Sequence, residues 1–120
     1  MSEQGSALSA LLLEQLMQAR NQQQVLTYRQ LLDALPLQVP KMQQLARLLE
    51  QLGEQDARRG WPLRSALVVS QAGSGLPRDG FFQHLAAANI LAMPADENEA
   101  RRWHEQELQR IYTFDYPGEA

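Results

Sequence analysis

The chain contains no cysteine, which excludes several kinds of chemistry at once. Without cysteine there is no disulfide, no thiolate ligand for zinc and no cysteine nucleophile. This composition fits a reducing compartment. The only two histidines, His84 and His104, lie far apart in the sequence and do not show the spacing of metal ligands. We therefore expect no metal site and no cofactor.

Lysine is almost absent too, since Lys41 is the only one. A phosphate-binding P-loop needs a lysine and then a serine or threonine after its last glycine. In the glycine-rich stretch SQAGSGLPRDG, Gly75 is followed instead by Leu76 and Pro77. Pro77 also interrupts the direct entry into a helix that a dinucleotide-binding loop requires. We therefore do not expect nucleotide binding or another small-molecule substrate.

Long hydrophobic runs are also lacking. No apolar run approaches the roughly 20 residues of a membrane-spanning helix. The short run Leu11–Leu13 is not preceded by lysine or arginine, as the apolar part of a signal peptide would be. We expect a cytoplasmic protein of bacterial type with no membrane partner.

The composition is that of a globular protein. The chain has 120 residues, of which 44% are hydrophobic and 21% are charged. This length predicts a single domain over residues 1–120. The net charge is −3, but the acidic residues gather after residue 96, which leaves the middle of the chain mildly basic. That distribution permits a nucleic-acid-binding face without requiring one.

The first half of the chain carries the signals of three helices. Residues 7–20 place leucines at four-residue spacing, which predicts a helix. Thr27 and Gln30 match a capping box at the start of a short helix that Pro36 ends. Pro40 then opens a longer helix. Its apolar stripe is Met42, Leu45, Leu49 and Leu52.

Two glycines mark the end of that third helix. Gly53 either costs the helix stability in its interior or ends it early. Gly60 is the firmer stop.

The second half begins with a strand and a loop. Residues 63–70 contain Val68 and Val69 and predict a strand, which the glycine-rich loop follows. A short helix is expected over residues 80–86. Asp96 begins a last helix with another capping box, and we expect the chain to fray after Phe114.

This order of elements favours one architecture. A helix followed by two more helices across a tight connector is typical of a helix-turn-helix core. A strand and a Gly/Pro loop directly afterwards are typical of a wing. The predicted fold is mainly α (α+β), with a winged-helix-like three-helix core, a short β-hairpin wing and additional C-terminal helices.

The stretch VLTYRQLLDAL resembles the opening of the C-terminal domain of alkylguanine-DNA alkyltransferases and alkyltransferase-like proteins. The later stretch WPLRSALVVSQAGSG resembles the strand and glycine-containing turn of the same domain. The resemblance implies a winged helix-turn-helix that binds duplex DNA. The acceptor cysteine is missing, and Leu63 and Arg64 stand near its position, so alkyl transfer is excluded. The connector PLQVP also departs from the turn of that family.

We predict a nucleic-acid-binding face from this fold. Glutamine can bind base edges and arginine can bind phosphate or guanine. The candidate contacts are Tyr28, Lys41, Gln43, Gln44, Arg47, Arg64 and Arg78. The alternative is that the residues of the third helix form an ordinary solvated face, because most of them are neutral rather than basic.

An enzyme is the least favoured class. Ser70, Ser74, Asp79, His84 and His104 supply the residue types of a nucleophilic serine site, but no G-x-S-x-G motif is present. We predict no catalytic residue. The first functional hypothesis is a non-enzymatic module that binds duplex DNA. The second is a protein-interaction module, either a homodimer or one that docks another protein, and the acidic composition and the apolar first helix favour it.

Overall fold

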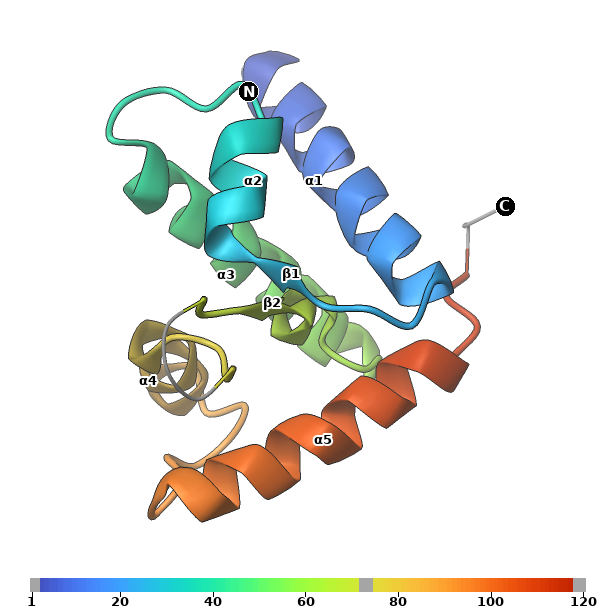
Figure 1. The fold of residues 1–120 in the computed structure, drawn as a ribbon, viewed down its shortest axis with the longest axis vertical. Coiled ribbons are helices and arrows are strands. Elements are labelled where there is room, and N and C mark those ends of the chain that lie inside the picture. Colours follow the sequence, from blue (N-terminus) through green and yellow to red (C-terminus); the bar gives the residue numbers. More distant parts are fainter. Residues whose placement is uncertain (1–2, 72–74, 118–120) are drawn as a thin grey trace.

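A computed structural model describes residues 3–71 and 75–117 of the chain (Figure 1). The described residues are mainly helical and surround a small parallel sheet, which confirms the mainly helical part of the prediction. The helices are α1 (Glu3–Asn21), α2 (Tyr28–Ala34), α3 (Lys41–Arg59), α4 (Asp79–Ala87) and α5 (Glu97–Thr113). The strands are β1 (Leu26–Thr27) and β2 (Val68–Val69), and a short 3-10 helix, η1 (Arg64–Leu67), precedes β2.

The first two helices form where local signals predict them. Leu8, Leu12 and Leu16 of α1 are buried. At the start of α2, the hydroxyl of Thr27 accepts the backbone N–H of Gln30 at 3.1 Å. The side-chain oxygen of Gln30 accepts the backbone N–H of Thr27 at 2.8 Å. This capping box satisfies two N–H groups that a helix start otherwise leaves unpaired.

Helix α3 passes through Gly53 and ends at Gly60. Leu45, Leu49, Gly53 and Asp56 are buried along one stripe of the helix, as their spacing predicts for a shared face. Gly60 has φ 73°, in the left-handed region where glycine has no Cβ penalty. Of the two interpretations of Gly53, the early end is therefore wrong, and Gly60 is confirmed as the stop.

The predicted strand over residues 63–70 is wrong except at Val68 and Val69. Two buried carboxylates take the backbone N–H groups that a longer strand would have given to a neighbour. The N–H of Leu63 donates to Glu107 Oε2 at 2.7 Å, and the N–H of Arg64 donates to Asp56 Oδ2 at 3.1 Å. The chain turns there as η1 and becomes extended only afterwards.

The predicted β-hairpin wing is not observed among the described residues. Strand β2 pairs with β1 in parallel, with Leu26 opposite Val68 and Thr27 opposite Val69, so α2 and α3 form the crossover between the two strands. The loop after β2 is closed at its base, where Ser70 donates its N–H to the carbonyl oxygen of Leu76 at 2.8 Å. Residues 72–74, within the proposed wing, lie outside the described part of the chain.

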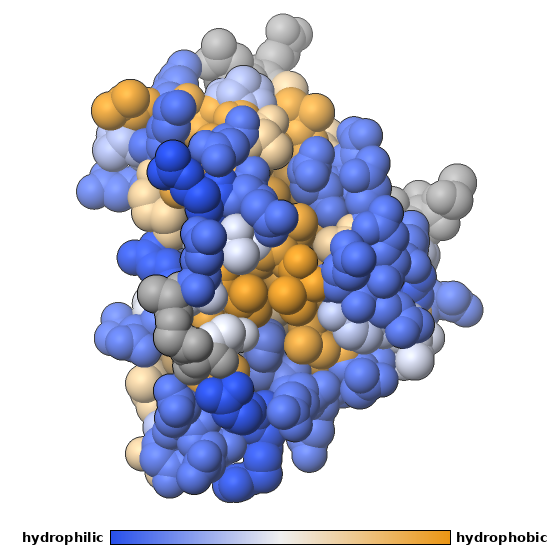
Figure 2. Space-filling model, in the orientation of Figure 1, coloured by the Kyte–Doolittle hydropathy of each residue, from blue (hydrophilic) through white to orange (hydrophobic). Residues whose placement is uncertain are grey.

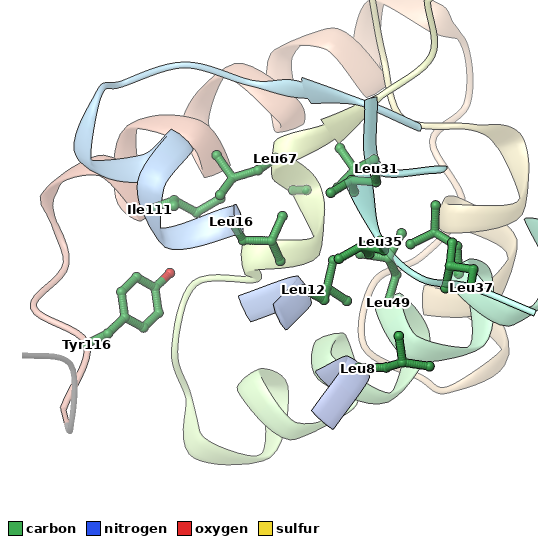
Figure 3. Close-up of a cluster of buried hydrophobic side chains, with 13 residues drawn as sticks. Leu8, Leu12, Leu16, Leu31, Leu35, Leu37, Leu49, Leu67, Ile111 and Tyr116 are labelled. Carbon is green, nitrogen blue, oxygen red and sulfur yellow. The ribbon is translucent and has the colours of Figure 1, made fainter. Parts of the chain in front are cut away.

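The main core fills the space around the sheet, which lies between α1 and α2 on one side and α4 and α5 on the other (Figure 1). Every helix except α4 contributes buried side chains to this core. Figure 3 shows them converging: Leu8, Leu12, Leu16, Leu31, Leu35, Leu37, Leu49, Leu67, Ile111 and Tyr116. A smaller cluster of Leu76, Phe82 and Ala100 holds α4 against α5.

The chain stays ordered beyond the predicted fraying point. Helix α5 ends at Thr113, but Tyr116 is buried and donates its hydroxyl to the carbonyl oxygen of Pro62 at 2.9 Å. Arg20 Nη2 donates to the carbonyl oxygen of Phe114 at 2.6 Å. The expectation that the chain frays after Phe114 is therefore wrong up to residue 117, because this segment packs between the ends of α1 and α3; residues 118–120 lie outside the described part of the chain.

Candidate functional site

Four of the predicted nucleic-acid contacts lie near the start of α3. Lys41, Gln43 and Arg47 are exposed, and Gln44 is half-buried. The side-chain oxygen of Gln44 accepts the backbone N–H of Gln38 at 2.6 Å, so Gln44 fastens the preceding connector. Lys41, Gln43 and Arg47 are the members of this group that stay open to a ligand.

The prediction that Arg64 contacts nucleic acid is wrong. Its side chain is 2% exposed. Its guanidinium donates to both oxygens of Asp56, at 2.8 Å to Oδ1 and 3.2 Å to Oδ2. The ring of Tyr116 covers it at 4.3 Å. Arg64 could reach a phosphate only by leaving a buried charge without its partner.

Tyr28 and Arg78, which are distant in sequence, meet in the structure. The backbone N–H of Arg78 donates to the hydroxyl oxygen of Tyr28 at 3.2 Å, and its guanidinium lies 5.6 Å from the centre of the tyrosine ring. Burial raises the pKa of Tyr28, so the phenol keeps its proton at neutral pH. That proton is not used in a hydrogen bond within the described residues.

A pocket of about 220 Å³ opens between α3 and α4, beside Tyr28 and Arg78. Helix α3 reaches it with residues spaced three and four apart, which places them on one side of the helix. Helix α4 supplies the facing wall, and η1 supplies Ser65. The lining residues are Tyr28, Ala46, Leu49, Glu50, Gly53, Ser65, Arg78, Gly80, Phe81, His84 and Leu85.

Ser65 is the least exposed polar residue of this lining. It is 3% exposed, and its hydroxyl has no hydrogen-bond partner within the described residues. Gly53 makes the close approach possible, because a Cβ atom there would lie 3.1 Å from Ser65 Oγ. The pocket therefore presents a buried hydroxyl that can both donate and accept.

His84 lies at the α4 side of the pocket beside two carboxylates of α3. Its Nε2 is 3.0 Å from Glu54 Oε2, and its Nδ1 is 3.9 Å from Glu50 Oε1. The contact between Nε2 and Glu54 does not form a hydrogen bond, although the Nε2 atom is buried. A neutral imidazole here touches the carboxylates, and a protonated one would form ion pairs with them.

The pocket does not join a serine and a histidine by a hydrogen bond among the described residues. An activated serine needs a base within hydrogen-bond reach, and no hydrogen bond joins Ser65 to His84 in the described structure. His104 is buried away from the pocket, with Nε2 2.8 Å from the carbonyl oxygen of Ala66. Ser74 lies outside the described residues. Over residues 3–71 and 75–117, no group of three or more histidine, aspartate and glutamate side chains could hold a metal ion.

Sequence reasoning missed Ser65 and Glu50 as pocket residues. Ser65 stands inside the apolar stretch that predicted a strand, and a single serine in such a stretch does not indicate a binding site. The available signal was Gly53, an interior helix glycine that costs roughly 1 kcal/mol relative to alanine. Such a glycine indicates a close approach from a neighbouring segment, and here that neighbour is Ser65.

A groove and an apolar area lie elsewhere on the described structure. A groove of about 170 Å³ between α1 and α3 is lined only by neutral residues, among them Leu13, Leu48 and Leu52. Figure 2 shows a further apolar area in the middle of the view, where Figure 1 shows the sheet. Val25, 39% exposed, directly precedes β1. None of the described helices combines the length and apolar character needed to cross a membrane.

Comparison with known proteins finds no match, whether with the models of protein families, the sequences of curated proteins or the solved structures.

Proposed function

We propose that this chain is a non-enzymatic module that binds a protein partner through the pocket between α3 and α4. The pocket, at about 220 Å³, is smaller than the roughly 300–1,000 Å³ typical of small-molecule sites. It reaches the surface, where the side chain of Glu50 is 46% exposed. It therefore suits one side chain of a larger ligand. The observation that carries the proposal is Ser65, a polar residue that is 3% exposed and lines this largely apolar pocket.

The charges around the pocket favour a protein over nucleic acid. Arg64 is withdrawn into the core. Glu50 lines the pocket, and Glu54 lies one helical turn further along α3, beside His84. Glu50 lies about one helical turn after Arg47 on α3 and lines the same pocket as Arg78. A duplex would bring its phosphates toward these carboxylates, and this repulsion opposes the attraction of the cations.

Duplex DNA remains a second candidate, because one set of cations is well placed for it. Lys41 and Arg47 are exposed along the first half of α3, with the neutral Gln43 between them. Arg78 is exposed at the pocket. Phosphate contacts of this kind give affinity that falls steeply as salt rises.

Selection from a displayed library of random peptides tests the first candidate. We expect peptides to be enriched on the wild-type protein and not on Ala46→Leu, which introduces a larger side chain into the pocket lining without lowering helix propensity much. Gln43→Leu is the matched control, because it places the same side chain on an exposed position of α3 outside the pocket lining. Equal enrichment on wild type and Ala46→Leu would remove the pocket from the proposal.

A labelled duplex provides the competing measurement. The second candidate replaces the first under three results together. The duplex shifts at low salt, the double variant Arg47→Ala/Arg78→Ala abolishes that shift, and no peptide is enriched.

The protein partner can also be a second copy of this chain. Sedimentation would then show a dimer in the wild type and a monomer in Ala46→Leu.

A further inference from the structure

We propose that the pocket between α3 and α4 recognises a tyrosine side chain of the partner. In this arrangement the ring packs on the apolar walls and the phenol hydroxyl hydrogen-bonds to Ser65 Oγ. This inference rests on the proposed function, because it names the group that a protein partner inserts.

The walls of the pocket suit an aromatic ring. Leu49 and Leu85 are buried, and their side chains belong to opposite helices. Phe81 and Tyr28 add two aromatic rings to the lining. Aromatic side chains pack favourably against such rings in edge-to-face or offset arrangements. Tyrosine is also among the residues that most often anchor protein interfaces.

The Ser65 hydroxyl sets the chemistry at the buried part of the lining. The residue is 3% exposed and lines the pocket, and its hydroxyl can donate to or accept from an occupant that displaces water from it. A phenol does both with one atom. The occupant therefore has an apolar body and a neutral polar tip, as tyrosine does.

Other side chains fit this lining less well. Leucine or phenylalanine would exclude water from Ser65 and leave its hydroxyl unpaired. A lysine ammonium would lose its water and find a single neutral hydroxyl in return. The carboxylates that could pair with a cation belong to Glu50 and Glu54, whose side chains are 46% and 45% exposed, so a cation paired with them would stay largely in contact with water.

The exposed polar groups complete the site for a peptide. Glu50 can accept a backbone N–H of the partner, and Arg78 can donate to a backbone carbonyl beside the inserted ring. Tyr28 still has its phenol proton for another acceptor. A free tyrosine derivative lacks most of these contacts, so its affinity will be low, but its preference for the pocket can be measured.

A matched pair of ligands tests the role of the hydroxyl. N-acetyl-tyrosinamide and N-acetyl-phenylalaninamide differ by one oxygen atom, and each can be titrated into the isotope-labelled protein while amide resonances are followed by NMR. We expect both to shift resonances around the pocket, with the tyrosine compound binding on the order of 3- to 10-fold more tightly, as one hydrogen bond allows. Equal affinities, or shifts elsewhere on the molecule, would overturn the proposal.

Ser65→Ala isolates the proposed contact. The variant removes the hydroxyl and keeps the pocket, so the two compounds should bind it equally. Ser70→Ala is the matched control, because Ser70 does not line the pocket and the preference for the tyrosine compound should survive there. If the preference for the tyrosine compound also survives in Ser65→Ala, Ser65 does not bind the phenol hydroxyl.

Two further results separate this inference from the proposed function. Enrichment of displayed peptides without a shared tyrosine would overturn the inference and leave the peptide-binding function standing. Stronger shifts with thymidine than with N-acetyl-tyrosinamide, at the same resonances, would indicate a nucleic-acid base in the pocket and overturn both.

Discussion

Helix α3 contributes acidic residues to two clusters of charged side chains, one buried and one partly exposed. Asp56 pairs with Arg64, and the two side chains are 0% and 3% exposed. Glu50 and Glu54 lie beside His84, with close to half of each carboxylate side chain exposed. The closed cluster faces the tail and η1, and the open cluster faces α4 and the pocket.

The difference teaches which charges hold the fold and which can meet a ligand. Asp56 accepts three hydrogen bonds from Arg64, two from the guanidinium and one from the backbone N–H. The rings of Trp61 and Tyr116 lie close to the same guanidinium. Such a buried pair has a fixed geometry, but a ligand cannot reach its charges. The two carboxylates of the open cluster are largely solvated, so they can exchange partners at little cost.

The largest expected effect comes from opening the closed cluster. Asp56→Ala leaves the Arg64 guanidinium buried without its carboxylate, which typically costs about 3–5 kcal/mol. We expect the free energy of unfolding, measured in a denaturant titration, to fall by that amount. The matched change in the open cluster, Glu54→Gln, should cost less than about 1 kcal/mol. Similar losses in the two variants would contradict the distinction between the clusters.

The next effect is a loss of stability in acid through the buried His104. Burial lowers the pKa of His104, although its hydrogen bond with the carbonyl of Ala66 works in the opposite direction. The unfolded chain, with an imidazole pKa of about 6.5, therefore takes up the proton first as the pH falls. The stability contributed by neutral His104 is present above about pH 6.5 and is lost below it.

Melting temperatures measured from about pH 7.5 down to about pH 5 check this expectation. His104→Gln should flatten the decline over this window. Ser70→Ala, which alters no titratable group, is the comparison variant and should leave the decline in place. A decline that persists unchanged in His104→Gln would contradict the assignment.

The parts of the fold that could be predicted from sequence are those that local interactions decide. The Thr27–Gln30 capping box and the left-handed stop at Gly60 depend on residues within a few positions. The helical spacing of the α1 leucines is equally local. The 3-10 turn at η1 depends instead on Asp56 and Glu107, and Glu107 comes from a helix formed much later in the chain.

The candidate site was harder to predict for the same reason. An arginine looks like a surface cation in sequence, and only the carboxylate of Asp56 and the ring of Tyr116 make Arg64 a core residue. Tyr28 and Arg78 were predicted contacts, and the structure brings them together at one pocket. Ser65 was not predicted, because its close packing depends on Gly53 in the preceding helix.

The smallest expected effect concerns that glycine. Gly53→Ala gains roughly 1 kcal/mol of helix propensity, but the new Cβ would lie 3.1 Å from Ser65 Oγ, so the serine must shift. We expect these two contributions to nearly cancel in the wild-type background. In a Ser65→Ala background the same change should stabilise the protein by up to about 1 kcal/mol. A double-mutant cycle in denaturant measures this coupling. Equal effects in both backgrounds would show that Gly53 is not there to admit Ser65, and the pocket lining would need another explanation.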